Sequence, residues 1–252
     1  MTKIALITGA SSGIGEACAY TFAQQGYHLI LVGRRAELLE KLADQLVASY
    51  KIEVKVLQVD VRDKEELTYK LDTLSAQWKK VEVLINNAGL SQGLDPIDKG
   101  SFDDWDTMID TNIKGLLYVT KIVSAWMVEN KKGHIINIGS IAGKEVYANG
   151  NVYCATKHAV DALNKAMRID LLPHGIKVTG IHPGAVETEF SIVRFKGDEA
   201  RAKKVYDGFE PLIAQDIAEA IWFAVSRPAH VNINDMLIMP TAQANGNLIK
   251  RD

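Results

Sequence analysis

The sequence predicts an α/β fold, in which a central, mostly parallel seven-stranded sheet carries helices on both faces and forms three layers. Two observations support this prediction. Short β-branched apolar runs alternate with segments of helical periodicity along nearly all of the 252 residues, and repeated strand–helix units form parallel sheets. The polar and glycine-rich breaks also fall where the apolar runs end, and such sheets bind ligands outside the carboxyl ends of their strands.

The first strand–helix unit contains a glycine-rich turn. The apolar run Lys3–Thr8 predicts a strand and Glu16–Gln25 a helix, with Gly9, Gly13 and Gly15 between them. Glycines allow a pyrophosphate to approach the backbone N–H groups of a helix N-terminus, where the dipole favours an anion. A plain strand-to-helix connection is the alternative, since the Gly-x-x-x-Gly-x-Gly spacing differs from the commoner fingerprint. The position between a clear strand and a clear helix favours dinucleotide binding.

The second predicted strand, His28–Gly33, ends in Arg34 and Arg35. An acidic residue at this point, about 20 residues past the glycine turn, would bind the ribose 2′-hydroxyl of NAD. Two guanidinium groups instead suit the 2′-phosphate of NADP. The alternative is that both arginines are ordinary surface residues before the next helix, whose first turn contains Glu37. We expect NADP(H) as the cofactor.

The later elements continue the alternation. In chain order we expect a strand at Glu53–Val59, a helix at Lys64–Gln77, a strand at Val81–Asn86, a long helical stretch from Asp103 to Glu129, and a strand at His134–Ile138. After these come a helix that contains Tyr153 and ends near Pro173, a strand at Lys177–His182, a helix near Asp216–Ser226 and a last strand near Met236–Met239. Because no linker, repeat or low-complexity segment interrupts the pattern, we expect one domain over residues 1–252.

Composition and charge exclude several classes of protein. With 47% apolar residues the chain can bury a large core, and a net charge of -2 gives no electrostatic reason to expect nucleic acid or an anionic membrane as partner. No apolar run approaches the ~18 residues of a membrane span, and the N-terminal run is too short for a signal peptide. We therefore expect a cytoplasmic protein. Cys18 and Cys154 suggest neither a disulfide nor a metal site, and both should pack as small apolar residues.

Tyr153 and Lys157 are one helical turn apart, so their side chains leave the same face of a helix. Acid–base chemistry by a tyrosine near neutrality requires roughly 4 kcal/mol of preferential stabilisation of the phenolate. A lysine ammonium beside the phenol can supply much of it. Such a pair is more often an amphipathic surface pair. The other motifs, including Ser140 after the strand at His134–Ile138, favour a catalytic pair.

Taken together, these motifs resemble the short-chain dehydrogenase/reductase family over nearly the whole chain. Thr8–Gly15 resembles the cofactor turn of the family and Asn86–Gly89 its sheet motif. The catalytic tetrad of the family is matched by Asn112, Ser140, Tyr153 and Lys157. The resemblance implies a Rossmann-type αβα sandwich and reversible hydride transfer between NADP(H) and a carbinol carbon, with the cofactor supplying the redox chemistry.

The resemblance also assigns roles. Tyr153 is the acid/base, Lys157 lowers its pKa and holds the nicotinamide ribose, and Ser140 hydrogen-bonds the substrate oxygen. Asn112 is placed at a local kink, holding a water that relays protons to Lys157; its alternative role is a solvent-facing polar residue within a helix. The implied cofactor-binding residues are Gly9, Ser11, Ser12, Gly13, Ile14, Gly15, Arg34, Arg35, Asp60, Val61, Asn87, Ala88, Gly89, Tyr153, Lys157, Pro183, Gly184, Val186 and Thr188.

Within the family, the chain is most similar to the NADP-dependent 3-hydroxy acid dehydrogenases that act on serine and allo-threonine. The segments that carry this resemblance are Asp110–Leu116, Gly133–Ser140, Arg194–Asp198 and Pro228–Asn234. A small hydroxy acid has a carboxylate that must be neutralised when water is expelled. The polar, glycine-interrupted segment Phe190–Phe209 is expected to be a mobile lid, and its Arg194 would bind that carboxylate. Alternatively Arg194 ties the lid to the protein surface, in which case Lys144 is the next candidate.

Other functions stay open at this point. A 3-oxoacyl carrier-protein reductase or broad carbonyl reductase is an alternative, although those enzymes typically end in a glycine-rich turn and strand, whereas this chain ends in Asn234–Pro240. A non-catalytic NADPH-sensing regulator would need no catalytic tetrad. The six histidines show no hydrolase pairing and are expected to be structural, with His182 the one that could border the pocket.

The resemblance further implies a homotetramer, formed by the long helices around Asn112 and Tyr153 and by the C-terminal strand.

Overall fold

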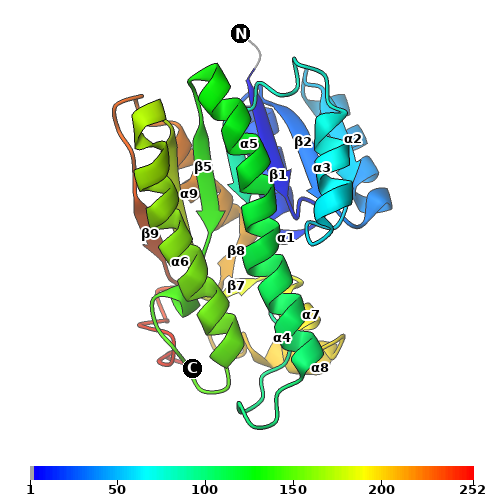
Figure 1. The fold of residues 1–252 in the computed structure, drawn as a ribbon. Coiled ribbons are helices and arrows are strands. Elements are labelled where there is room, and N and C mark those ends of the chain that lie inside the picture. Colours follow the sequence, from blue (N-terminus) through cyan, green and yellow to red (C-terminus); the bar gives the residue numbers. More distant parts are fainter. Residues whose placement is uncertain (1–2) are drawn as a thin grey trace.

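The computed structural model describes residues 3–252, and within them it contains a seven-stranded sheet in the order β3-β2-β1-β4-β5-β6-β9. Every pairing in this sheet is parallel. The strands are β1 (Ile4–Thr8), β2 (His28–Gly33), β3 (Val54–Gln58), β4 (Val83–Asn86), β5 (His134–Ile138), β6 (Lys177–Pro183) and β9 (Asp235–Ile238). Their carboxyl ends point toward the bottom of Figure 1, where the C-terminus also lies.

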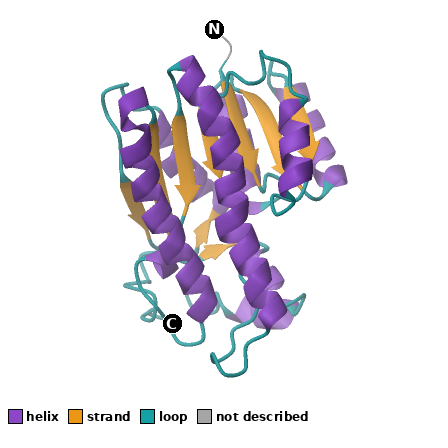
Figure 2. Ribbon diagram, in the orientation of Figure 1, coloured by secondary structure: helices purple, strands orange, loops and turns teal. Residues whose placement is uncertain are grey.

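Helices cover both faces of the sheet, as predicted (Figure 2). They are α1 (Gly13–Gln24), α2 (Ala36–Ser49), α3 (Lys64–Asp72), α4 (Phe102–Ile109), α5 (Leu116–Asn130), α6 (Asn151–Leu171), α7 (Phe190–Arg194), α8 (Glu199–Lys204) and α9 (Ala214–Val225). Shorter elements are the π-helical η1 (Asp110–Gly115), the 3-10 turns η2 (Ile141–Gly143) and η3 (Leu172–His174), and the paired strands β7 (Val186–Glu187) and β8 (Leu212–Ile213).

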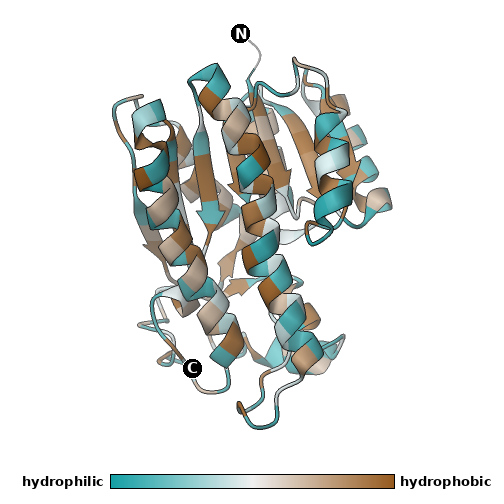
Figure 3. Ribbon diagram, viewed as in Figure 1, coloured by the Kyte–Doolittle hydropathy of each residue, from teal (hydrophilic) through white to brown (hydrophobic). Residues whose placement is uncertain are grey.

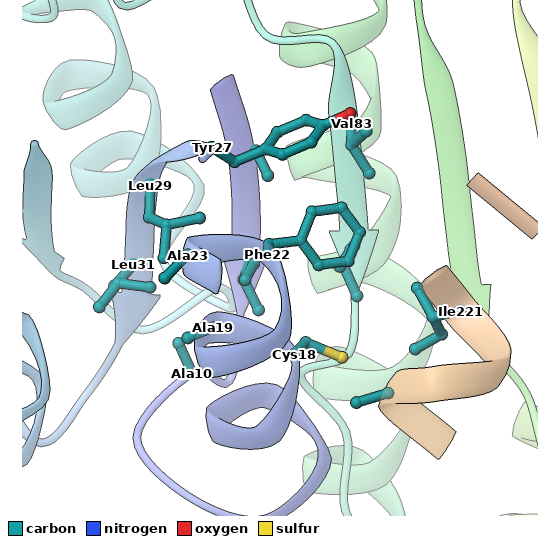
Figure 4. Packing of buried hydrophobic residues seen from close by; sticks show 14 of the residues in the cluster. Ala10, Cys18, Ala19, Phe22, Ala23, Tyr27, Leu29, Leu31, Val83 and Ile221 are labelled. Atoms are coloured by element: carbon teal, nitrogen blue, oxygen red, sulfur yellow. The ribbon is translucent and has the colours of Figure 1, made fainter. Parts of the chain in front are cut away.

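The alternation of side chains in β1 explains the three layers. Ala5 and Ile7 belong to a buried cluster with α1, α2 and α9, whereas Ile4 and Leu6 belong to a second cluster with α3, α5 and α6. The inner strands β1, β2, β4, β5 and β6 are buried almost throughout, as a covered parallel sheet requires, whereas the edge strands β3 and β9 are partly exposed. Figure 4 shows the first cluster around Phe22, and Figure 3 shows largely hydrophobic strands between helices of mixed character.

Two expected helices differ from the structure. The helix expected to reach Gln77 ends at Asp72, where the Thr73 hydroxyl donates to the Lys70 carbonyl at 2.7 Å. The chain then turns, and Trp78, which is 7% exposed, packs into the second cluster. The long stretch expected from Asp103 to Glu129 is two α-helices separated by η1.

Both cysteines are buried and free, as expected. Cys18 packs in the first cluster from α1, and Cys154 lies on α6 against the cleft described below. Within residues 3–252, no helix combines the length and the apolar character that crossing a membrane requires.

Candidate active site

A cleft at the carboxyl ends of β1, β2, β4, β5 and β6 brings together most of the predicted site residues. Of the predicted catalytic, cofactor and substrate residues, all but two line it. The lining contains Gly9, Ser11, Ser12, Gly13, Ile14, Arg34, Arg35, Asp60, Val61, Asn87, Ala88, Gly89, Ser140, Tyr153, Lys157, Pro183, Gly184, Val186, Thr188 and Arg194. The exceptions are Gly15 and Asn112, which lie behind the cleft wall and are described below.

The glycine turn is shaped by close contacts with the end of β4. A Cβ on Gly9, whose φ is +64°, would lie 3.0 Å from the Ala88 Cα, and a Cβ on Gly15 would lie 2.3 Å from the Gly9 carbonyl oxygen. Asn87 fixes this arrangement because its Nδ2 donates to the Thr8 carbonyl at 2.9 Å. Gly15 therefore allows α1 to pack onto the turn instead of contacting a ligand, while Gly9 keeps the turn open to the cleft.

The N-terminus of α1 faces the cleft without a side-chain cap. Ser12 is the N-cap residue, yet its side chain makes no cap hydrogen bond. Instead its hydroxyl accepts a bond from Arg35 Nη2 at 2.6 Å. The first N–H groups of the helix, at Gly13 and Ile14, are thus left to a ligand, and their partial positive charge favours an anion. These residues fit the pyrophosphate of a dinucleotide.

Arg35 lies in the cleft and Arg34 at its rim. Arg35 donates from Nε to Ser11 Oγ at 3.1 Å and from Nη1 to Glu189 Oε2 at 2.8 Å. This hydrogen bond holds the pKa of Glu189 below its ordinary value. The Arg34 side chain is 60% exposed, with Nη1 3.9 Å from Asp60 Oδ2. Both guanidinium groups can reach a phosphate at this end of the cleft, with Arg35 the more firmly placed.

Asp60 is bound by an arginine that the sequence reasoning did not consider. Arg62 Nη2 donates to Asp60 Oδ2 at 2.7 Å, and its Nε contacts both carboxylate oxygens. Burial raises the pKa of Asp60, but the hydrogen bonds from Arg62 outweigh burial and hold the pKa below its ordinary value. Asp60 therefore presents a charged, oriented carboxylate beside Val61 at the cleft edge.

Tyr153 and Lys157 lie on the same buried face of α6, as their spacing predicts. Lys157 is 6% exposed, and its Nζ donates to the Ile138 carbonyl at 2.9 Å. Burial lowers the pKa of Lys157 to about 8. Ser140 begins η2 directly after β5, and its Oγ accepts from the Ala142 N–H at 3.1 Å. The ends of β5 and α6 thus bring the three side chains into one site.

Two cations, Arg194 and Lys157, lie near the Tyr153 ring. Burial raises the pKa of Tyr153, and Tyr147 raises it further, while Arg194 and Ser140 lower it. Lys157 Nζ is turned toward the end of β5 and lies 6.0 Å from the Tyr153 ring centroid. Arg194 is therefore a second cation near the Tyr153 phenol, in addition to Lys157.

Asn112 is neither solvent-facing nor part of the cleft lining. It lies in η1 and is 2% exposed. Its Oδ1 accepts from the Leu90 N–H at 2.9 Å, and its Nδ2 donates to the Leu90 carbonyl at 2.8 Å and to Thr156 Oγ1 at 3.1 Å. A Cβ on Gly89 would lie 3.2 Å from Asn112 Oδ1 and 3.6 Å from Lys157 Nζ. The π-helical segment matches the expected irregularity in the helix.

Arg194, not Lys144, faces the cleft beside Tyr153. The Arg194 Nε donates to Ser91 Oγ at 3.1 Å, its Nη2 donates to the Tyr147 hydroxyl at 2.8 Å, and its guanidinium carbon lies 5.2 Å from the Tyr153 ring centroid. Lys144 is absent from the lining and is bound to two carboxylates. Of the two candidate carboxylate-binding residues, only Arg194 lines the cleft beside Tyr153.

Several lining residues were missed by the sequence reasoning. They are Leu90, Thr111, Tyr147, Glu189, Gln243, Gly246 and Ile249, among others. Gln243 comes from the C-terminal segment, and its Oε1 accepts from the Ala185 N–H at 2.8 Å. No local motif marks these positions. The one available signal was Tyr147, an aromatic residue shortly before Tyr153, which could have been predicted to line the same cleft. His182 does not line the cleft.

Comparisons with known proteins agree on one family. Residues 3–198 match the family model described as short chain dehydrogenase. An NADP-dependent 3-hydroxy acid dehydrogenase of Salmonella typhi is 48% identical over 246 residues, covering 97% of this chain and 98% of that protein. Sulfoacetaldehyde reductase 2 of Chromohalobacter salexigens is 44% identical over 245 residues, covering 97% and 96%. The closed form of a serine dehydrogenase complexed with NADP+ has a TM-score of 0.93 at 46% identity and 99% coverage of both chains.

Proposed function

Because the chain belongs to the short-chain dehydrogenase family, we propose that it is an NADP(H)-dependent oxidoreductase that acts on the hydroxyl-bearing carbon of a small 3-hydroxy acid. One observation carries the substrate assignment: the Arg194 guanidinium lies 5.2 Å from the Tyr153 ring centroid. An arginine there can bind a substrate carboxylate while the substrate hydroxyl meets the Tyr153 phenol. The 3-hydroxy acid and serine dehydrogenases among the relatives support the same assignment.

The cofactor assignment is supported by the other end of the cleft. The uncapped N-terminus of α1 suits a pyrophosphate, and Arg34 and Arg35 suit a 2′-phosphate. The Salmonella typhi relative is NADP-dependent, and the serine dehydrogenase structure contains NADP+. When bound, NADP(H) accepts or supplies the hydride.

The chain's own residues then handle the proton and the substrate charge. Tyr153 takes the hydroxyl proton during oxidation and returns a proton to the carbonyl oxygen during reduction. Its raised pKa keeps the phenol protonated at neutral pH, which suits the reduction direction. Ser140 donates a hydrogen bond to the substrate oxygen, where charge develops. Lys157, which lines the cleft, would hold the nicotinamide ribose, and Asn112 would position a water that passes protons to Lys157.

Serine and allo-threonine are the substrates that we propose within this class. A small sulfonate-bearing aldehyde is the second candidate, because Arg194 can bind a sulfonate as it binds a carboxylate and because sulfoacetaldehyde reductase 2 is 44% identical to the chain. An uncharged carbonyl compound would leave Arg194 without an anionic partner in the cleft. This argues against a broad carbonyl reductase.

The proposal is tested by measuring NADP+ reduction with serine, allo-threonine and other 3-hydroxy acids, and NADPH oxidation with sulfoacetaldehyde and a 3-oxoacyl carrier protein. We expect turnover of the hydroxy acids. The kcat/KM for an uncharged alcohol of equal size should be well below the kcat/KM for the hydroxy acids. Preferred reduction of the 3-oxoacyl carrier protein would favour that alternative. NADPH binding without turnover of any substrate would indicate a regulator and contradict the proposal.

We also propose that the chain is a single domain that acts as a homotetramer, with residues 190–209 as the substrate lid. Exposed apolar side chains lie on the elements expected at the interfaces: Leu117 on α5, Ile169 on α6 and Leu237 on β9. Light scattering at micromolar concentration tests the assembly, and a monomer would contradict it.

Two buried free thiols, Cys18 and Cys154, suit the reducing cytosol, where we expect the enzyme to act.

A further inference from the structure

A cluster of charged side chains lies beneath the segment that carries Ser140, outside the cleft. Lys144 Nζ is 2.6 Å from Asp161 Oδ1 and 3.4 Å from Asp235 Oδ1. His182 Nε2 is 2.9 Å from Asp235 Oδ1 and 3.8 Å from Asp161 Oδ1. The four residues come from the end of η2, α6, β6 and β9, so the cluster joins elements that are far apart in the chain.

We propose that Lys144, Asp161, His182 and Asp235 are positioning residues that fix the Ser140 turn, defined as residues 139–144, against α6. The inference rests on the proposed role of Ser140 in binding the substrate oxygen. A hydrogen bond that must form in the transition state loses its effect when its donor is misplaced by a fraction of an ångström.

The cluster contacts the Ser140 turn at both of its ends. Lys144 is the last residue of the turn. At the other end, the His182 ring lies against Gly139, so that a Cβ on Gly139 would be 2.3 Å from His182 Nδ1. The Gly139 N–H also donates to the Ile181 carbonyl at 2.7 Å. Ser140 is therefore held between two groups that share Asp235.

The cluster also connects the turn to the helix that carries the acid–base pair. Asp161 is one helical turn after Lys157 on α6, so the ion pair of Lys144 with Asp161 joins the Ser140 turn to that helix. Backbone packing supports the same junction, because a Cβ on Gly143 would lie 2.6 Å from the Lys157 carbonyl oxygen. A shift of Lys144 would consequently move Ser140 relative to Tyr153.

Two members of the cluster are buried, while the Lys144 and Asp235 side chains are 27% and 32% exposed. Asp161 is 8% and His182 1% exposed. Replacing Lys144 removes one of the two cations that neutralise the buried Asp161 carboxylate, so the remaining groups rearrange. The carboxylates and the imidazole are close enough together to suggest a metal site. However, the Lys144 ammonium already supplies the cation between Asp161 and Asp235.

Asp161 offers a matched control because a second lysine binds its other oxygen. Lys165 Nζ is 2.6 Å from Asp161 Oδ2. Lys165 is on the same helix as Asp161 and its side chain is 56% exposed. Lys144 and Lys165 therefore neutralise the same carboxylate at the same distance, but only Lys144 ties the Ser140 turn to α6.

The experiment compares Lys144→Met with Lys165→Met in the full-length enzyme. Lys144→Met should lower kcat for the hydroxy acid by about tenfold or more while the Kd for NADPH, measured by fluorescence titration, changes by less than about threefold. Lys165→Met should change kcat by less than about twofold. Lys144→Arg should recover part of the lost kcat, because a cation again bridges the two carboxylates. A purely structural role would lower thermal stability without this separation of kcat from NADPH binding.

Equal kcat values for Lys144→Met and Lys165→Met would overturn the inference. Should Lys144→Met fail to fold, Asp235→Asn carries the same test with the same expected result, since the Asp235 side chain is 32% exposed. Ser140→Ala separates the two proposals. If it abolishes turnover while Lys144→Met keeps the wild-type kcat, the positioning role alone is wrong. If wild-type enzyme turns over no hydroxy acid, the proposed function fails and this inference fails with it.

Discussion

The cofactor end of the cleft is formed mainly by backbone groups, whereas the substrate end is formed mainly by side chains. At the cofactor end the backbone shapes the site: Gly9 allows a close approach, and the N–H groups that begin α1 face the cleft. At the substrate end, side chains from distant segments converge, with Arg194 bonded to Ser91 and Tyr147. A short motif determines the first kind of site, whereas the second exists only after the chain has folded. The two ends should accordingly respond to mutation independently.

The largest effect is expected where the two ends meet. Tyr153→Phe should lower kcat by at least ~10², because it removes the positioned acid–base hydroxyl. The Kd for NADPH should stay within about twofold, since the backbone that shapes the cofactor end is unchanged. Stopped-flow turnover and NADPH titration check both values. A wild-type kcat in this variant would contradict the assignment of Tyr153.

The next effect should be confined to the cofactor end. Replacing Arg34 and Arg35 together with alanine should raise KM for NADP+ by roughly 10- to 100-fold and KM for NAD+ far less, because only the 2′-phosphate loses charge-assisted hydrogen bonds. Arg35→Ala should account for most of the change, since Arg34 is 60% exposed at the rim. Steady-state kinetics with both cofactors measures the ratio. Equal increases for NADP+ and NAD+ would show that the arginines have another role.

Glu189 sharpens this prediction because its carboxylate already occupies one Arg35 donor. A phosphate that binds Arg35 through Nη1 must displace that carboxylate. Glu189→Gln should therefore tighten 2′-AMP binding severalfold, by about 1 kcal/mol or less, because the ion pair is half-exposed. The effect should vanish in the Arg35→Ala background. Calorimetric titration of the four proteins gives the coupling, and unchanged 2′-AMP affinity in Glu189→Gln would refute the competition.

At the substrate end, Arg194→Ala should raise KM for a 3-hydroxy acid by roughly tenfold or more, equivalent to about 1.4 kcal/mol. An uncharged alcohol of similar size should be much less affected. Arg201→Ala is the matched control, because Arg201 is an arginine of the same lid that stacks on Phe195 and does not line the cleft. If acid and alcohol suffer equally, the lid has been destabilised and the carboxylate binds elsewhere.

The smallest effect on activity is expected from replacing His134, which lies at the start of β5, while Ser140 follows the end of that strand. Burial lowers the pKa of His134 to about 3 from an ordinary value of 6.5. Between pH 6.5 and 3, His134 is therefore protonated in the unfolded chain but neutral in the folded protein. The free energy of unfolding should consequently fall by up to ~1.4 kcal/mol per pH unit as the pH drops from 6.5 toward 3. His134→Gln should flatten this part of the profile in urea titrations while kcat at neutral pH stays near that of the wild type.

Sequence reasoning worked where the structure depends on neighbouring residues. The β-branched runs predicted the strands, and the glycines between Gly9 and Gly15 predicted the turn that lines the cleft. Helical spacing predicted that Tyr153 and Lys157 share one face of α6. It failed at the end of α3, because the apolar pattern continues to Trp78 although the chain turns to bury that side chain against other elements.

The substrate end was harder to predict for a physical reason. Tyr147, Glu189 and Gln243 have no spacing in common, and each reaches the cleft through a loop or a terminal segment whose path is set by packing. The direction of the Lys157 ammonium was also beyond the sequence, because it depends on the carbonyl of Ile138 at the end of another strand. Arg194 was identified only because few cations lie early in the lid.

The π-helical segment η1 fixes how many residues this part of the chain must contain. A π-helical turn holds one residue more than an α-helical turn, so α4 and α5 are out of step with each other by one position. Deleting a single residue from 110–115 would remove that extra residue and allow a continuous α-helix in which α4 and α5 keep the faces they present now. The residues of η1 itself would shift, however, and Asn112 would lose its hydrogen bonds to Leu90. A single-residue deletion in η1 should therefore disturb the surroundings of Asn112 while the helix and its core contacts persist.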